Sequence, residues 1–280
     1  MTSDALARLI VPAVLLAMLY AEAPAARAGG EDACEIDAEA IAKDFGDLLA
    51  APVHWDTEQW LAAAATGAAT GALVAWGDEG MRRAATEDPN GFPYVVAHKL
   101  AILGRWYGKN GINPVIAVGV VAGGMWIAGE ARDDPALVRT AAIAVESWAF
   151  TGILTGAIKL VAGRSRPFTG DGAHRWSFVG LHPRERRSFP SGHAASAFSL
   201  ASTVSRRHDD WWVQVPAYTL ATGAALARVD TDVHWASDVL FGAVLGVAVS
   251  AFLVERHSCG NGDAGSSGGT PAYVSFSVVF

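Results

Sequence analysis

Residues 188–205 read SFPSGHAASAFSLASTVS, a polar turn followed directly by a helical segment. Pro190 and Ser191 favour the start of a helix, and Gly192 lets the backbone come close to a ligand. The free N–H groups and the dipole of a helix start attract anions, and the Ser191 hydroxyl adds a donor. His193 lies in the first turn and would face the same anion. The stretch therefore predicts a helix that begins at an anion-binding turn.

Six apolar segments rich in Ala and Gly have the length and composition of buried helices. They cover residues 61–77, 112–128, 138–162, 192–205, 211–227 and 237–254. The alternation of β-branched residues that is typical of strands is sparse in them. We therefore expect an all-α fold, a helical bundle of about six core helices. Only the end of the chain, AYVSFSVVF at 272–280, alternates like a short strand, and we expect it to pack back on the domain as a tail.

The composition places the chain among folded proteins. Hydrophobic residues make up 51% of the 280 residues and charged residues 18%, which excludes an intrinsically disordered protein. The net charge of −7 argues against a general nucleic-acid binder, so we expect no nucleic-acid partner.

The first 28 residues have the layout of a secretory signal peptide. Arg8 precedes an apolar run over 9–21, and small residues lead to an Ala-x-Ala cleavage site that ends at Ala28. We expect an exported protein of the periplasm or cell envelope; the alternative is an uncleaved N-terminal anchor. In an oxidising compartment, Cys34 and Cys259 would either form a disulfide or remain two unpaired thiols.

The rest of the chain divides by composition. Residues 29–57 are acidic with helical spacing, residues 58–257 hold the six apolar segments, and residues 258–280 combine a Gly/Ser-rich linker with the alternating tail. We therefore expect an N-terminal acidic helical segment, one helical domain, and a linker with a tail.

The apolar segments are short for membrane spans. Most have 14–18 residues, whereas about 20 are needed to cross the hydrocarbon of a bilayer. Glu146 lies in the middle of the third segment, where a carboxylate would be costly in lipid. We expect a compact bundle in the periplasm that rests on a membrane surface. The alternative is an integral inner-membrane protein of six spans with its site facing the periplasm.

Lysine and arginine gather between residues 159 and 187. Lys159 and Arg166 are seven residues apart, or two helical turns, so both cations project from one face. Seven basic side chains stand in this stretch against Asp171 and Glu185, a local charge of +5 in an acidic protein. This excess suggests an anion site; a solvated basic loop is the alternative.

A third motif, ARVDTDVHWASD, covers residues 227–238. His234 and Asp238 are four residues apart and thus adjacent on one helix face. A carboxylate that accepts from Nδ1–H fixes the imidazole tautomer and leaves Nε2 free as a base or nucleophile. Arg228 offers a planar fork for phosphate oxygens. We expect no metal here, because one His and one Asp supply only two ligands beside cationic side chains.

Together these motifs resemble the type 2 phosphatidic acid phosphatase (PAP2) superfamily, which also contains bacterial class A acid phosphatases and vanadium haloperoxidases. The resemblance rests on Lys159 with Arg166-Pro167, on Pro190-Ser-Gly-His193, and on Arg228 with His234 and Asp238. It covers about residues 138–254 and implies that 58–257 form a PAP2-like catalytic helical domain.

The resemblance also implies a role for each motif residue. His234 would attack phosphorus to form a phosphohistidine, with Asp238 orienting it. His193 would protonate the leaving oxygen and then activate water. The phosphoryl oxygens would be held by the remaining motif residues, Lys159, Arg166, Ser191, Gly192 and Arg228. No metal and no cofactor would be needed, since in phosphoryl transfer the protein mostly positions groups and stabilises charge.

Two features depart from the family pattern. Ala227 stands where the family usually has Ser, so we expect one hydrogen bond to phosphate to be missing. Asp230 and Asp232 lie between Arg228 and His234. We expect both carboxylates to face solvent; the alternatives are that they repel a dianionic substrate or select one that carries a cation.

The sequence thus predicts an exported, metal-independent phosphatase that hydrolyses phosphate monoesters or pyrophosphates. The apolar composition and the resemblance favour a lipid-linked substrate. The alternatives are a non-specific periplasmic acid phosphatase on soluble esters, a vanadate-dependent haloperoxidase, and a non-enzymatic envelope scaffold with a vestigial phosphate site.

Overall fold

The structure, a computed structural model, describes residues 36, 38–87, 98–102, 104, 113–208 and 210–258. Several expectations therefore fall outside the described residues. These are the signal peptide (1–28), Cys34, Cys259 and the strand-like tail (272–280).

The described residues are mostly helical and contain no strand, which confirms the all-α expectation. The helices are α2 (Ala38–Ala50), α3 (Thr57–Ala72), α4 (Asp78–Glu87), α6 (Pro114–Arg132), α7 (Pro135–Ala162), α8 (Gly192–Arg207), α9 (Trp211–Asp230) and α10 (Ala236–Arg256). A π-helical turn, Leu73–Gly77, joins α3 to α4. Short 3-10 turns cover Ala51–His54, Pro167–Thr169 and Arg184–Arg186.

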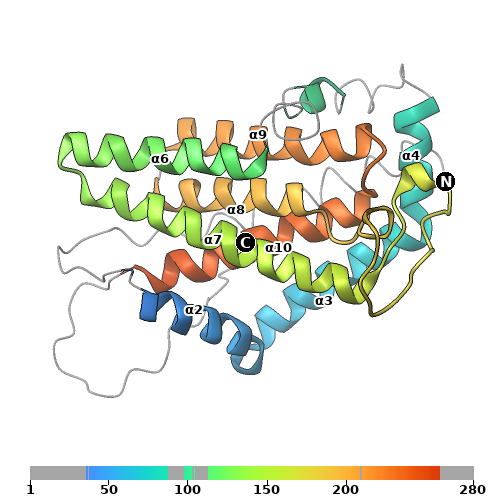
Figure 1. The fold of residues 1–280 in the computed structure, drawn as a ribbon, viewed down its shortest axis with the longest axis horizontal. Coiled ribbons are helices and arrows are strands. Elements are labelled where there is room, and N and C mark those ends of the chain that lie inside the picture. The colour runs from blue at the N-terminus through green and yellow to red at the C-terminus, as the bar shows by residue number, and fades with distance from the viewer. Residues whose placement is uncertain are drawn as a thin grey trace.

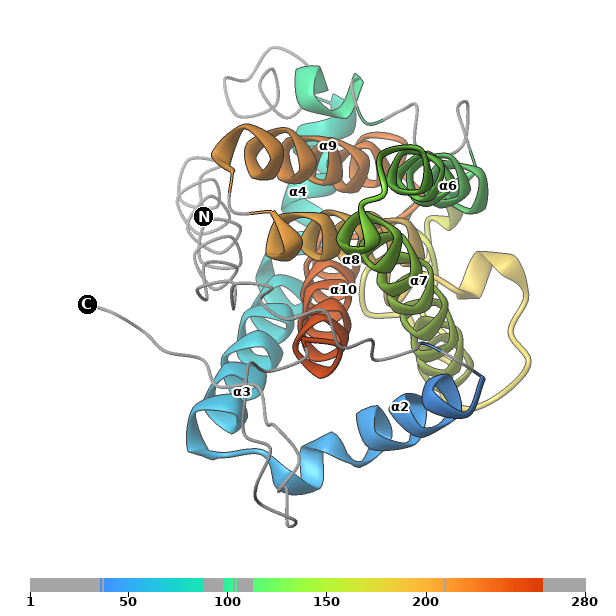
Figure 2. The same ribbon diagram turned by 90° about the vertical axis from the view of Figure 1, so that its left-hand side faces the viewer.

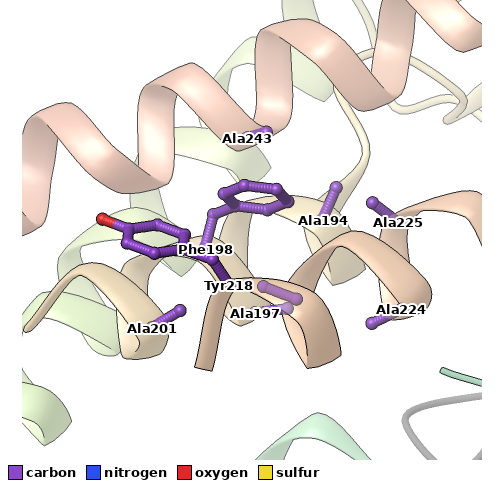
Figure 3. Packing of buried hydrophobic residues seen from close by; sticks show 9 residues of the cluster. Ala194, Ala197, Phe198, Ala201, Tyr218, Ala224, Ala225 and Ala243 are labelled. Atoms are coloured by element: carbon purple, nitrogen blue, oxygen red, sulfur yellow. The ribbon is translucent and has the colours of Figure 1, made fainter. Parts of the chain in front are cut away.

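Helices α8 and α10 form the centre of the bundle. Figure 2 shows them surrounded by α9, α6, α7 and α3, with α2 on the outside below α7 and α10. Small side chains dominate the core between α8, α9 and α10, and Phe198 of α8 and Tyr218 of α9 fill the larger spaces among the alanines (Figure 3). Alanine keeps a high helix propensity while letting helix axes come close.

The contact between α8 and α10 is close enough to require glycine. A Cβ built on Gly246 would lie 2.1 Å from the carbonyl oxygen of Ala195, and one on Gly242 would lie 2.5 Å from that of Ser191. Because Ser191 precedes the first residue of α8, this contact places the start of α8 directly beside α10.

The helices are longer than the apolar segments suggested. Helix α7 has 28 residues and α10 has 21, because each helix extends beyond the apolar segment that predicted it. Asp134 caps α7 with a side-chain oxygen that accepts from the Leu137 N–H at 3.1 Å. The premise that the helices are too short to cross a bilayer was therefore wrong.

Four helical stretches of the described chain are long and apolar enough to cross a membrane: Thr57–Thr86, Pro114–Arg132, Pro135–Thr169 and Ala236–Arg256. Helix α6 presents most of its apolar side chains outward, for example Val120, which is 63% exposed, and Ile127, which is 70% exposed. Apolar faces of this extent fit membrane association.

Replacing Gly246 tests the close contact of α8 with α10. Gly246→Ala would place a methyl group against the backbone of Ala195, so we expect the free energy of unfolding to fall by about 1–3 kcal/mol. Chemical denaturation in detergent micelles, followed by circular dichroism, measures this change. Gly152→Ala on α7 is the matched control, because its Cβ would meet no atom within 4 Å. Equal stability of the two variants would contradict the packing described.

Candidate active site

The three sequence motifs converge at one end of the bundle. Figure 1 shows the loop between α7 and α8 at the same end as the junction of α9 and α10. The Ser191 N–H donates to the carbonyl oxygen of Asp238 at 2.9 Å. The Arg166 guanidinium donates to the carbonyl oxygen of Val233 at 3.3 Å. Residues that are 47 and 67 positions apart in the sequence are thus held together by direct hydrogen bonds.

Asp238 lies in the first turn of α10 and has hydrogen bonds on both carboxylate oxygens. Oδ2 accepts from the Ser188 hydroxyl at 2.5 Å and from the Trp235 N–H at 2.9 Å. Oδ1 accepts from Arg164 Nη1 at 2.6 Å. The carboxylate is completely buried, so these donors fix its orientation.

His234 and Asp238 are neighbours, as their spacing predicted, but they are not hydrogen-bonded. Nδ1 of His234 lies 3.6 Å from Oδ2 of Asp238, which is an ion-pair distance and too long for a hydrogen bond. Nδ1 therefore faces the carboxylate, and Nε2, on the opposite edge of the ring, faces away from it.

Arg164 is the central residue of a buried network that the sequence analysis did not assign to the site. Its Nη2 lies 2.7 Å from Asp78 Oδ2 of α4, and its Nη1 lies 2.6 Å from Asp238 Oδ1 of α10. Ser237 joins the same network, donating from its hydroxyl to Asp78 and accepting from Arg164. The guanidinium also lies over the Trp176 ring, 4.8 Å from its centroid.

Only part of this network had a signal in the sequence. Arg164 belongs to the basic cluster and Ser188 directly precedes the Phe-Pro-Ser-Gly-His stretch, so both stood near the predicted site. Asp78 lies 86 residues before Arg164 and has no motif around it. Its part in the site follows from the tertiary structure alone.

Arg228 and His234 are buried and each keeps a nitrogen without a hydrogen-bond partner. Arg228 is 2% exposed and His234 is 3% exposed. Among the described residues, Nε of Arg228 and Nδ1 of His234 have no hydrogen-bond partner. A buried guanidinium with an unsatisfied donor is expensive unless an anion approaches it, so the site suits a phosphoryl group.

Lys159 and Arg166 both donate hydrogen bonds to the loop before α8. The Lys159 ammonium donates to the carbonyl oxygens of Arg187, Ser188 and Pro190. Arg166 Nε donates to the carbonyl oxygen of Arg184 at 3.0 Å. Both side chains thus connect to the loop before α8 and place basic groups beside the histidines.

Ser191 is the N-cap of α8. Its hydroxyl oxygen accepts from the Ala194 N–H at 3.4 Å, and the residue is fully buried. A Cβ on Gly192 would lie 3.8 Å from Thr155 Cγ2, so the protein itself leaves room for a side chain there. The expectation that Gly192 serves a close approach of ligand to backbone stays a prediction.

Both motif histidines are held neutral. Burial lowers the pKa of His234 to about 3, with Lys159 and Arg166 acting in the same direction and Asp238 opposing them. Burial also lowers the pKa of His193 to about 4, and the nearby cations, among them Arg228, Arg166 and Arg184, act in the same direction. The two imidazoles therefore respond to one shared group of positive charges.

The expectation that Asp230 and Asp232 face solvent was wrong. Asp232 accepts a bidentate pair of hydrogen bonds from Arg82 of α4, at 2.7 and 2.9 Å. Asp230 Oδ1 lies 2.7 Å from Nδ1 of His98. These contacts tie the loop before His234 to the segments that precede α6. The physical reason is that each carboxylate finds a basic partner that is distant in the sequence.

Comparison with known proteins agrees with this geometry. Residues 140–258 match the sequence model of the PAP2 superfamily. This stretch, 119 of the 280 residues, is thus similar to the PAP2 superfamily. The match confirms the resemblance drawn from the motifs, because it includes all three of them.

A second comparison found a relative whose name states an activity, but a shorter stretch of this chain matches it. A stretch of 81 residues is 38% identical to the lipid A 1-phosphatase of Porphyromonas gingivalis. That stretch covers 28% of this chain and 18% of the relative, so the chain matches less than a fifth of the relative's length. No solved structure matches the chain.

Removing the Arg164 side-chain charge tests the buried network. Arg164→Gln would leave Asp78 and Asp238 buried without their shared cation, so we expect the free energy of unfolding to fall by about 3–5 kcal/mol. Denaturant titration measures this loss. Arg175→Gln, an exposed arginine of the same loop, is the control and should change stability by less than about 0.5 kcal/mol. A similar, small effect of both variants would show that the network does not stabilise the fold.

Removing one cation beside His193 tests the electrostatics of the site. Arg184 acts to lower the pKa of His193, because a neighbouring positive charge disfavours imidazolium. In Arg184→Gln the pKa of His193 should therefore rise, and the imidazolium should persist to higher pH. Nuclear magnetic resonance titration of the histidine ring signals measures the shift. Arg132→Gln at the end of α6 is the control; a lowered or unchanged pKa in Arg184→Gln would contradict the arrangement.

Proposed function

We propose that this PAP2-superfamily protein is a phosphatase that hydrolyses phosphate monoesters or pyrophosphates through a phosphohistidine at His234. The observation that carries the proposal is a buried, neutral imidazole held beside fixed cations and an oriented carboxylate. A neutral imidazole is a competent nucleophile, and fixed positive charge stabilises the phosphoryl oxygens in the transition state.

In the first step, Nε2 of His234 attacks phosphorus. Asp238 faces Nδ1 and favours the tautomer that carries its proton there, which leaves the Nε2 lone pair free. The bond from phosphorus to the leaving oxygen breaks, and the leaving oxygen takes a proton from His193. Arg228, Lys159 and Arg166 balance the phosphoryl charge, while Ser191 and Gly192 at the start of α8 add donors.

The second step regenerates the enzyme. His193, now neutral, takes a proton from water as the water oxygen attacks phosphorus. The phosphorus–nitrogen bond breaks, and its electron pair returns to His234 Nε2 as inorganic phosphate forms. The cations that lower the pKa of His193 in the free protein are offset by a bound phosphate dianion, which raises that pKa toward the range of a general acid.

We propose further that the substrate is lipid-linked. The described chain has four helical stretches apolar enough to cross a bilayer, so the site would lie near a membrane. The similarity to a protein named lipid A 1-phosphatase supports the same class of substrate. The proposal includes export to the periplasm or cell envelope, which rests on the layout of residues 1–28.

Replacing the nucleophile tests the reaction. We expect purified chain to release phosphate from phosphatidate in mixed micelles, and His234→Ala to be at least about 10⁴-fold slower, because no phosphohistidine can form. Phosphate release and acid-labile labelling of the protein by ³²P substrate are the measurements. His174→Ala, an exposed histidine of the loop before α8, is the matched control and should retain full activity.

Two outcomes would contradict parts of the proposal separately. Equal activity of wild type and His234→Ala would reject the nucleophile. Loss of activity in His234→Ala together with a higher kcat/KM for p-nitrophenyl phosphate than for phosphatidate would keep the phosphohistidine and reject the lipid-linked substrate.

A further inference from the structure

A second cluster of titratable side chains lies at the opposite end of the bundle from the histidines described above. It consists of Asp44 of α2, Glu146 of α7 and His257, which directly follows α10. One possible ligand atom from each residue lies within 4.8 Å of the others. All three residues are at least nine-tenths buried.

This cluster is remote from the proposed phosphate site. Glu146 precedes Lys159 by 13 residues on α7, which corresponds to about 20 Å along the helix. Asp238 and His257 lie near opposite ends of α10, about 28 Å apart on the same basis. Figure 1 shows α2 and the end of α10 on one side of the molecule and the motif loops on the other.

The His257 imidazole cannot donate a hydrogen bond to both Glu146 and Asp44 from the one nitrogen that faces them. Nε2 of His257 lies 2.9 Å from Glu146 Oε2 and 3.2 Å from Asp44 Oδ2. A ring nitrogen carries at most one hydrogen, so it makes one good hydrogen bond. Among the described residues, Asp44 Oδ2 and Glu146 Oε1 have no hydrogen-bond partner. A buried carboxylate oxygen that faces the cluster without a donor calls for a cation.

The distances from His257 Nε2 to the two carboxylates are compatible with ligands around one metal ion. Nitrogen and oxygen ligands lie about 2.1 Å from a zinc ion, so two ligands separated by 90° to tetrahedral angles are about 3.0–3.4 Å apart. The distances from His257 Nε2 to the two carboxylates are close to this range. One imidazole with two carboxylates suits a divalent first-row metal such as zinc.

Arg256 orients the Asp44 carboxylate, and the carboxylates near the cluster carry more charge than Arg256 neutralises. Arg256 Nε donates to Asp44 Oδ1 at 2.7 Å, which turns Oδ2 toward His257. Arg256 also pairs with Asp47, at 2.6 Å. The carboxylates of Asp44, Asp47 and Glu146 outnumber the one guanidinium by two, an excess of negative charge that a divalent cation balances. The negative end of the α10 dipole adds to the attraction.

We propose that Asp44, Glu146 and His257 bind a divalent transition-metal ion that fastens α2 to α7 and α10. The apolar contacts of α2 support the same docking, since the Phe45 and Phe150 rings meet edge to face with centroids 4.9 Å apart. The ion joins the acidic N-terminal helix to the PAP2 domain and takes no part in the chemistry at His234. The inference is independent of the proposed function.

Metal binding to the full chain tests the site. A Cys34→Ser/Cys259→Ser chain, purified in detergent and stripped with a chelator, removes thiols as ligands. We expect it to bind about one Zn²⁺ per chain, measured by mass spectrometry of metal content, with a rise in Tm of about 5 °C or more at 100 times the Kd. Co²⁺ in place of Zn²⁺ should give visible absorption bands.

Variants of the cluster residues test whether the ion binds at Asp44, Glu146 and His257. Glu146→Gln and Asp44→Asn should each lose the stoichiometric Zn²⁺ and the rise in Tm. Glu39→Gln, an exposed acid of the same helix as Asp44, should keep both. If the stripped chain binds no Zn²⁺ or Co²⁺ and its Tm does not change, the proposal is overturned. Full binding by both variants would overturn it as well. The Zn²⁺ and Co²⁺ measurements on the unsubstituted cluster decide the question even where a variant fails to fold.

Discussion

The buried ion pairs of Arg164 hold together the end of the molecule that carries the three sequence motifs. One guanidinium joins Asp78 of α4 to Asp238 of α10 and hydrogen-bonds to the carbonyl oxygen of Ala173 in the loop between α7 and α8. Taking these charges out of water is costly, and the arrangement persists because nearly every polar atom of the group is paired. The orientation of Asp238, whose Oδ2 lies 3.6 Å from Nδ1 of His234, depends on this network.

The network explains how a bundle of small residues supports a polar site. Glycine and alanine let α8 and α10 approach until the Ser191 backbone touches α10. Such close backbone contact leaves little freedom for the first turn of either helix. Arg228, Lys159 and Arg166 then hold positive charge beside His193 and His234, and burial keeps both imidazoles neutral. The packing of the helices thus sets both the positions of the two histidines and the charges around them.

Two separate clusters of charged side chains lie near opposite ends of the bundle. The motif residues lie at one end, and Asp44, Glu146 and His257 lie at the other. Glu146 is the residue that argued against membrane spans in the sequence, yet it is paired with His257 and buried by α2. A buried, paired carboxylate does not face lipid, so it does not weigh against membrane association of α7.

The sequence by itself determined the helical segments and the residues of the three motifs. Apolar spacing is a local property, and motif residues such as His234 and Asp238 are close in the chain, so both could be identified without coordinates. Only the tertiary structure decided the partners: Asp78 for Arg164, Arg82 for Asp232, and Glu146 for His257. These pairs join residues 86 to 150 positions apart. Their contacts arise from the packing of whole helices, which no local pattern encodes.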